Sequence, residues 1–323
     1  MIRLLIATGL VALFVWNPYP FQYLELKGYD TLIMSTEPVQ NDNIILIDVD
    51  EEIVEAYGGY PLPRTFYSDF IKRTNVAGIT VLMPDTDIRD RNNDFELAST
   101  MATNPTVLAS AASTQSQDLS LHVGTAELGE DPRPWLYQYP GILRTESIVA
   151  LNAKGLGVVT ATPEIDGVTR RIPLVVNVQS KLYPAFALEL LRVGLDHPSY
   201  QLKTTPEGID WIRVPGYPLM KTDGNGRIFL DWNTKFYKQT VSEFMKSPID
   251  APFAIIGVTA EGVVNPTPTP AGLKYPHEIQ ANILHNLING SAPSTPTWAP
   301  AGELLGLTLG LLLVALTVSS IYI

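Results

Sequence analysis

The sequence predicts an α/β domain with a mostly parallel or mixed sheet, flanked by a transmembrane helix at each end. Short β-branched runs alternate with helical patterns through the middle of the chain, which is typical of α/β folds. A hydrophobic segment lies at each end of the 323-residue chain. Apolar residues make up 46% of the sequence, which is ample for a packed core.

Residues 1–17 are expected to form a membrane anchor. Residues 2–16 are apolar apart from one arginine and one threonine, and Asn17, Pro18 and Pro20 stop the segment. Because it is shorter than the roughly 20 residues that cross a bilayer core, a cleaved signal peptide or a buried helix is the alternative. Trp16 suits the membrane interface and no small-residue cleavage site follows, which favours an uncleaved anchor. Arg3 then favours a cytoplasmic amino terminus and places the body of the chain outside.

Residues 301–323 are expected to form a second transmembrane helix. Leu304–Ile323 holds no charged residue, and Trp298 precedes it at the expected interface. Residues 291–300, which are rich in proline, then form a juxtamembrane linker. Because no cationic residue follows the helix to hold a cytoplasmic exit, we expect the natural chain to continue beyond Ile323.

Five elements are predicted at the start of the body. Residues 43–49 form a buried strand, because their apolar run is too short for a helix and carries three isoleucines. Helices follow at 64–74, opened by a proline, and at 93–101, and strands at 78–83 and 106–111. This order predicts parallel strands joined by right-handed crossovers.

The rest of the body continues the alternation after one long interruption. Residues 113–140 show no periodicity, so they are expected to form a long loop that is either functional or poorly ordered. The later patterns predict strands at 157–161, 172–178, 227–230 and 253–258, and helices at 184–193 and 277–288, the last closed by Asn289 and Gly290.

Composition and motifs exclude several functions. The net charge is −11, from 22 Lys and Arg against 33 Asp and Glu, and no basic run exists, which argues against nucleic-acid binding. The absence of cysteine excludes disulfides, thiolate nucleophiles and cysteine-bound zinc. No nucleophile elbow, phosphate-binding loop or Ser-His-Asp arrangement can be found, so no enzyme activity and no cofactor are expected from these residues.

Four aspartates follow the first two predicted strands. Asp48 and Asp50 end the first strand, and Asp85 and Asp87 follow the second. A parallel sheet would bring them to its carboxyl edge, where α/β sheets place ligands, and Asp48 and Asp50 would point to one side. Arg64 starts the intervening helix and could neutralise them through its planar fork. The residues therefore form either a ligand or cation site, or a structural salt bridge with Asp50 as a helix cap.

Three further features have weaker interpretations. Arg170 and Arg171 lie in a predicted turn that leads into the strand at 172–178, where Arg170 either binds an anionic group or belongs to a surface pair. The acidic run Asp85–Asp94 fails as a calcium loop, because Phe95 stands where glycine is required, so the metal content stays unknown. His277 and His285 lack a third ligand for zinc, and we expect them on the helix surface or at its cap.

Four ordered blocks resemble the type 2 CHASE domain, an extracytoplasmic sensory module of bacterial adenylate cyclases and histidine kinases. The resemblance covers residues 24–290. The blocks are LELKGYD at 24–30; IILIDVD at 44–50 with PLPR at 61–64; DGVTRRIPL at 166–174 with YPAFALELLR at 183–192; and IIGVTAEGVVNPTPTP at 255–270 with HEIQANILHNLING at 277–290.

The resemblance implies a receptor in the cell (inner) membrane whose main domain lies in the periplasm or outside the cell. Its cytoplasmic output, a cyclase or a kinase, is absent from these residues. The expected partners are the lipid bilayer, a second copy in a homodimer, and an extracytoplasmic protein or small ligand. Gly302, Gly306 and Gly310 have the four-residue spacing of close-packed membrane helices, which supports the homodimer. The alternative is a structural or assembly subunit of an envelope complex that senses no small molecule.

Overall fold

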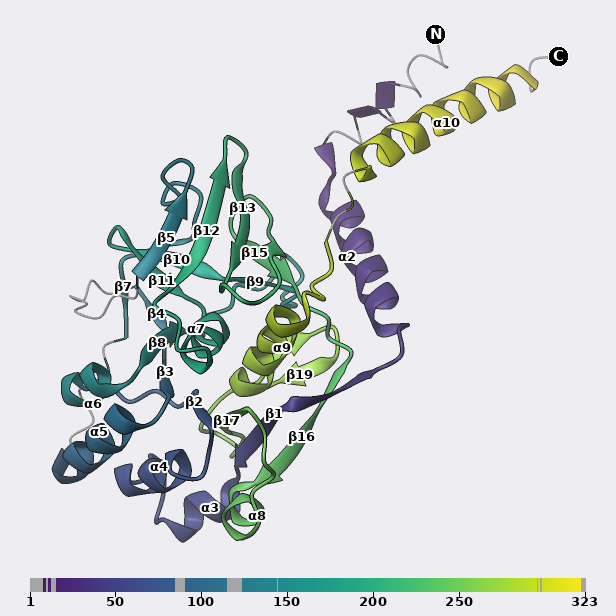
Figure 1. Cartoon of the computed structure of the whole chain (residues 1–323). Coiled ribbons are helices and arrows are strands. Elements are labelled where there is room, and N and C mark those ends of the chain that lie inside the picture. The colour runs from purple at the N-terminus through teal and green to yellow at the C-terminus, as the bar shows by residue number, and fades with distance from the viewer. Residues whose placement is uncertain are drawn as a thin grey trace. The chain divides into compact units, whose positions relative to one another are not determined.

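The chain divides into two units (Figure 1). The larger unit, Thr36–Pro293, is called the body, and the smaller one, the terminal unit, comprises Met1–Ser35 and Ser294–Ile323. The computed structural model describes residues 8, 9, 11, 12, 16–84, 91–114, 124–143, 145–294, 296 and 298–320.

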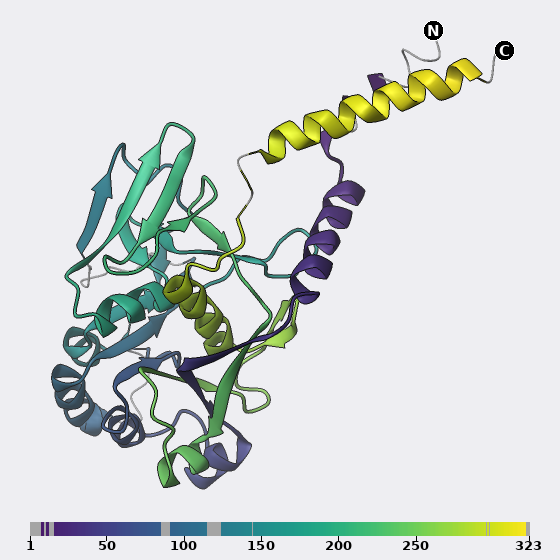
Figure 2. The ribbon, with the colours of Figure 1, turned by 45° about the vertical axis from the view of Figure 1, so that its right-hand side comes forward.

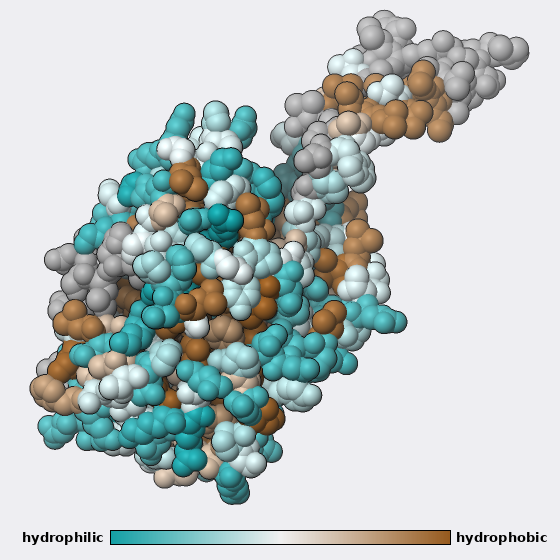
Figure 3. Space-filling view, viewed as in Figure 1, coloured by the Kyte–Doolittle hydropathy of each residue, from teal (hydrophilic) through white to brown (hydrophobic). Residues whose placement is uncertain are grey.

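The terminal unit contains two long helices, α2 (Tyr19–Met34) and α10 (Ala299–Ser320). The predicted helix stop is confirmed, because Trp16 is helical whereas Asn17 and Pro18 are not, but a further helix, α2, begins directly after it and was not predicted. Pro18 is the N-cap of α2 and Pro20 lies in its first turn, where the missing N–H needs no partner. Figure 3 shows hydrophobic side chains gathered along the described part of α10. In the part of the chain that the structure describes, no helix is both long and apolar enough to cross a membrane.

A six-stranded parallel sheet forms the centre of the body. Every ladder in it is parallel, which confirms the predicted mostly parallel sheet. Residues 44–47 of its longest strand are fully covered, as expected for a sheet buried on both faces. In spatial order the strands are β16 (Thr234–Thr240), β1 (Val39–Val49), β17 (Phe253–Val258), β2 (Val76–Ile79), β3 (Thr106–Ser110) and β8 (Gly155–Val158).

The strand order differs from the predicted one at a position that matters for the site. The predicted strand–helix–strand order would make β1 and β2 neighbours, but β17 lies between them, with Ile256 paired to both Ile47 and Ile79. Strand patterns in a sequence identify strands without fixing their order, and β17 returns to the sheet about 200 residues after β1. The ends of β1 and β2 are therefore two ladder spacings apart, roughly 10 Å.

Helices cover both faces of the sheet (Figures 1 and 2). The crossovers that start from β1, β2, β3 and β16 all advance in the same direction across the sheet, so right-handed connections place their helices on one face. These are α3 (Glu51–Ala56), α4 (Arg64–Ile71), α5 (Asp94–Thr103), α6 (Ser147–Asn152) and α8 (Val241–Lys246). The other face is covered by α7 (Phe186–Gly194) and α9 (Pro276–Asn289), which pack against each other.

The elements predicted from apolar periodicity are present. The four predicted helices of the body correspond to α4, α5, α7 and α9, and Gly290 closes α9 in the left-handed conformation with φ 64°. The predicted strand 172–178 is divided at Leu174 into β9 (Arg171–Pro173) and β10 (Val175–Val178). The helices α3, α6 and α8 were missed, because each has only six residues.

The described part of the predicted loop 113–140 is largely structured, which corrects that prediction. Residues 115–123 lie outside the described residues, but β5 (Gly124–Leu128) pairs with β12 (Ser199–Thr205), and β6 (Gln138–Tyr139) pairs with β10. Partners this distant in sequence leave no local periodicity to read. The remaining strands are β4 (Ala112–Ser113), β7 (Gly141–Ile142), β11 (Lys181–Pro184), β13 (Gly208–Arg213), β14 (Met220–Lys221), β15 (Arg227–Phe229), β18 (Thr267–Thr269) and β19 (Gly272–Lys274), and a 3-10 turn spans Arg91–Asn93.

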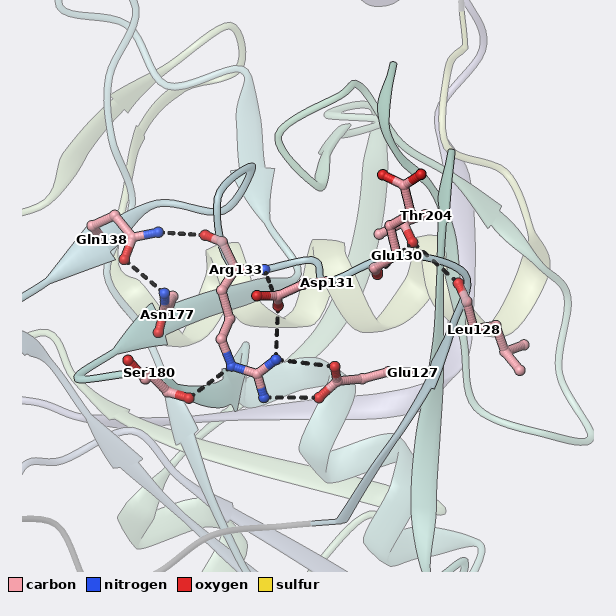
Figure 4. Close-up of polar contacts among 9 residues, drawn as sticks. All are labelled: Glu127, Leu128, Glu130, Asp131, Arg133, Gln138, Asn177, Ser180 and Thr204. Atoms are coloured by element: carbon pink, nitrogen blue, oxygen red, sulfur yellow. Dashed lines mark hydrogen bonds and ion pairs between the residues drawn. The ribbon is translucent and has the colours of Figure 1, made fainter. Parts of the chain in front are cut away.

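Arg133 holds together the segment that was predicted to be a loop (Figure 4). Its guanidinium donates to both carboxylate oxygens of Glu127, at 3.1 and 3.0 Å, and to Asp131 at 2.8 Å. Its Nε donates to the carbonyl oxygen of Ser180, in the turn between β10 and β11, at 2.8 Å. One side chain thus joins the segment after β5 to a second sheet.

Gly157 allows β8 and α7 to approach closely, and this contact can be tested. A Cβ at residue 157 would lie 2.3 Å from Cα and 2.8 Å from N of Phe186, so the backbone of α7 would have to move. We expect Gly157→Ala to lower the free energy of unfolding by about 2–3 kcal/mol in urea denaturation. Gly124→Ala, where the nearest contact would be an ordinary 3.5 Å, is the control. Equal stabilities of the two variants would contradict this packing.

Candidate functional site

A polar site lies where β1 meets the start of α9. Asp48, near the end of β1, and His277, in the first turn of α9, are joined by a hydrogen bond of 2.7 Å between Oδ1 and Nε2. The imidazole is fully buried, whereas 22% of the Asp48 side chain is exposed. Gly257 of the neighbouring strand makes room, because a Cβ there would overlap the imidazole. The sequence reasoning found Asp48 but missed His277 as its partner.

Glu278 extends this site towards β16. Its Oε1 accepts hydrogen bonds from Lys238 Nζ at 2.6 Å and Lys274 Nζ at 3.4 Å, and its Oε2 accepts one from the backbone N–H of Tyr275 at 2.8 Å. Burial alone would raise the pKa of Glu278, but the lysines and the backbone donor lower it overall. The carboxylate is therefore held in its charged form at the start of α9, where the helix dipole also favours a negative charge.

Asp50 and Arg64 have partners of their own on the opposite face of the sheet. Asp50 lies one residue beyond β1 and caps α3 by accepting the N–H of Ile53 at 3.1 Å, which confirms the helix-cap interpretation. Arg64 is buried, and its Nε donates to Asp94 Oδ1 at 2.9 Å. Asp94 is a site residue that the sequence reasoning missed, because it lies 30 positions away on α5.

The expectation that Asp48 and Asp50 point to one side is wrong. Asp48 contacts α9, whereas Asp50 has left the strand and starts α3, whose Ile53 packs into the core on the other face. Asp85 and Asp87 lie outside the described residues, and with them most of the acidic run Asp85–Asp94. Among the described residues, no group of three or more carboxylate or imidazole side chains is placed to hold a metal ion.

Arg170 is fully buried, so its interpretation as part of a surface pair is wrong. It forms a bidentate pair with Asp166, with Nη1 and Nη2 each 2.8 Å from a carboxylate oxygen. The neighbouring Arg171 forms the same kind of pair with Glu164, at 2.6 and 2.7 Å. Burial alone would raise the pKa of Glu164, but the arginines lower it overall. The DGVTRR motif therefore joins the loop after β8 to β9 through two carboxylate–guanidinium pairs.

Both histidines of α9 are buried, which corrects the expectation that they lie on the helix surface. His285 Nδ1 lies 2.7 Å from Asn41 Nδ2 and 3.2 Å from Asn289 Nδ2. Burial lowers the pKa of His285, and the opposing charge of Asp231 is the smaller effect. The sequence did contain a signal for these buried polar residues. In HEIQANILHNLING, polar residues recur at helical spacing, and α9 places Glu278 and His285 between itself and the sheet.

Comparison with known families identifies a relationship across nearly the whole chain. A family model described as the CHASE2 domain matches residues 6–318. This range contains all the sequence blocks that carried the resemblance to type 2 CHASE domains. Comparisons with curated proteins and with solved structures gave no match.

The buried pair of Arg64 and Asp94 gives a prediction about stability. Their side chains are only 4% and 5% exposed, so Arg64→Ala would remove the guanidinium that faces a buried carboxylate. We expect a loss of about 3–5 kcal/mol in the free energy of unfolding. The double variant Arg64→Met with Asp94→Leu should lose less, because it removes both charges. Arg73→Ala, on the exposed end of the same segment, is the control, and a single variant as stable as this control would show that the pair is not structural.

Proposed function

The chain belongs to the CHASE2 domain family, whose members are sensory domains of signalling proteins, and we propose that it is a membrane-anchored receptor facing the outside of the cytoplasm. A sensory domain binds or responds and does not catalyse, in agreement with the lack of a catalytic arrangement in the sequence. The family match carries the proposal, because it extends from the first hydrophobic segment to within α10.

In this proposal the two hydrophobic segments lie in the membrane and the body lies in the periplasm or outside the cell. Arg3 supports a cytoplasmic amino terminus. Trp16 and Trp298 lie at the ends of the two segments that adjoin the body, and tryptophan at these positions supports a location at the membrane interface. The exposed leucines of α10 suit contact with lipid: Leu304, Leu305, Leu309, Leu312 and Leu313.

Signal transfer would pass through α9. The helix contacts β1 and β17, binds Lys238 of β16 through Glu278, and leads through residues 290–298 into α10. A stimulus that shifts α9 therefore acts directly on the segment that enters the membrane. Such a stimulus must bind one arrangement of the body better than another. The output would be a cyclase or kinase domain that follows Ile323 in the natural chain.

We place the proposed ligand at the carboxyl edge of the sheet near Asp48. The Asp48 and Lys238 side chains are 22% and 46% exposed, so an external molecule can reach them. Arg64 and Arg170, by contrast, are buried in carboxylate pairs and are better suited to holding the fold. Ligands of α/β sheets commonly bind at this edge.

The orientation can be tested with single cysteines, because these 323 residues contain no cysteine. We expect Glu207→Cys, at an exposed position of the body, to react with a membrane-impermeant maleimide in intact spheroplasts. Ile2→Cys should react only after the membrane is permeabilised. The opposite pattern, or protection of both sites until lysis, would contradict the extracytoplasmic placement.

The proposed homodimer gives a second test. A Cβ at Gly306 would meet nothing within 4 Å in its own chain, so Gly306→Ile should leave α10 intact while separating two closely packed helices. We expect a clear loss of dimer in detergent, measured by analytical ultracentrifugation. Thr308→Ile, on the other side of α10, is the control. An unchanged monomer–dimer ratio for Gly306→Ile would contradict packing through these glycines.

A further inference from the structure

We propose that the contact between Asn41 of β1 and His285 of α9 is a proton-sensitive switch, which is closed when His285 is neutral and opens when it is protonated. The proposal is based on the direction of one hydrogen bond. Asn41 Nδ2 and His285 Nδ1 are 2.7 Å apart, and both residues are almost fully buried. Either atom of such a pair can be the donor in principle, so the surroundings must decide.

The backbone of β1 fixes which end of the Asn41 amide faces the histidine. The register between β1 and β16 shifts between Asn41 and Ile45, and Asn41 Oδ1 accepts hydrogen bonds in this interval from the N–H groups of Asn43, at 2.9 Å, and Ile44, at 3.1 Å. Rotating the amide would place its NH₂ group against two backbone donors. Asn41 Nδ2 must therefore donate to His285, and His285 Nδ1 must accept.

The second neighbour of His285 Nδ1 agrees with this assignment. Asn289 Nδ2 lies 3.2 Å from Nδ1 and also donates to the carbonyl oxygen of His285 at 3.0 Å, so its NH₂ end faces the imidazole. Two amide donors thus converge on one ring nitrogen. A proton on Nδ1 would point at the NH₂ group of Asn41, and both residues are almost fully buried although Asn289 is exposed, so the contact with β1 would be lost.

In the described part of the chain, the other groups that face His285 offer no hydrogen-bond acceptor for a proton on Nδ1. Phe236 of β16 presents its ring at 6.3 Å between centroids in an edge-on arrangement, and Asn41 is the facing group from β1. Asp231, in the connection before β16, is the charged group whose field acts on the imidazole, and it favours protonation. Burial has the larger effect and lowers the pKa of His285 below the ordinary 6.5, so the closed contact contains the neutral ring.

The lowered pKa of His285 determines the direction of the pH response. At a pH well above 6.5, His285 is neutral in both the closed and the opened arrangement, so the closed contact has its full stability. As the pH falls below 6.5, the solvated imidazole of the opened arrangement takes up a proton that the closed one excludes. Acidification therefore favours opening, by as much as about tenfold in population per unit of pH.

The position of the contact gives it a consequence for signalling. Asn41 lies close to the start of β1, the first strand after α2, and His285 lies one turn before the end of α9, the last helix before α10. The contact thus joins the two places where the chain enters and leaves the body. Its relevance as a response to external acidity depends on the proposed extracytoplasmic placement, whereas its dependence on protons does not.

Hydrogen exchange of the full 323-residue chain in detergent tests the switch. The backbone amides of residues 43 and 44 report on it, because they donate to Asn41. His285→Asn keeps an acceptor oxygen at the position of Nδ1 and cannot be protonated. At each pH the same peptide is compared in the two proteins, so its intrinsic exchange chemistry cancels. We expect equal rates at pH ~7.5 and faster exchange in the wild type below ~6.5, by as much as about tenfold per unit of pH.

Two controls separate this effect from general acid sensitivity. His197→Asn changes a histidine that bonds to the carbonyl oxygen of Ser199, and it should respond like the wild type. His277→Gln keeps a donor towards Asp48 and should also respond like the wild type. A wild-type rise that persists in His285→Asn, or a wild type with no rise, would overturn the proposal. Because the experiment uses purified protein, it can fail or succeed independently of the spheroplast labelling.

A second measurement does not depend on any variant folding. Nitrogen-15 NMR shifts distinguish the two neutral tautomers of an imidazole. We expect His285 of the wild type at pH ~7.5 to carry its proton on Nε2 and to leave Nδ1 bare, because Nδ1 accepts from Asn41 and Asn289. A proton found on Nδ1 at this pH would refute the direction of the hydrogen bond on which the switch depends.

Discussion

The central six-stranded sheet depends on the position of its first strand, β1, between β16 and β17, the last two strands of the chain that join it. β1 pairs with β16 on one side and with β17 on the other, and both ladders are parallel. During folding, the sheet therefore cannot be completed until residues 234–258 have paired with residues 39–49. Because these pairings are distant in sequence, closing the loop between them costs entropy before any contact is gained. The buried apolar run Ile44–Ile47 offsets this cost by packing on both faces at the centre of the sheet.

The same constraint brings the two ends of the body together. β1 is the first strand after α2, and α9, which packs over β1 and β17, is the last helix before α10. A change in how α9 sits on β1 therefore affects both connections to the hydrophobic segments at once. In a sheet whose first and last strands lay at opposite edges, the two connections could move independently.

Sequence reasoning predicted the elements of this fold better than their arrangement. Apolar runs such as residues 253–258 and the cap at Gly290 were correct, because each is set by local chemistry. The insertion of β17 between β1 and β2 could not be read, because β-branched runs do not encode their neighbours. The site suffered from the same limit. Asp48 and Asp50 were correctly predicted at the end of the first strand. Their hydrogen-bond partners could not be predicted, because these lie on helices that start in different parts of the sequence.

Two kinds of contact hold α9, and they restrict its movement in different ways. Against α7 the contact includes apolar packing, which has no direction and tolerates a small displacement. Against β1 and β16 it is held by directional hydrogen bonds through His277, Glu278 and His285, each of which is either made or lost. A helix restrained in this way has discrete positions, one for each set of hydrogen bonds that can form together. Replacing the polar residues with apolar ones could hold α9 as firmly, but it would remove the distinct alternatives between which a stimulus can select.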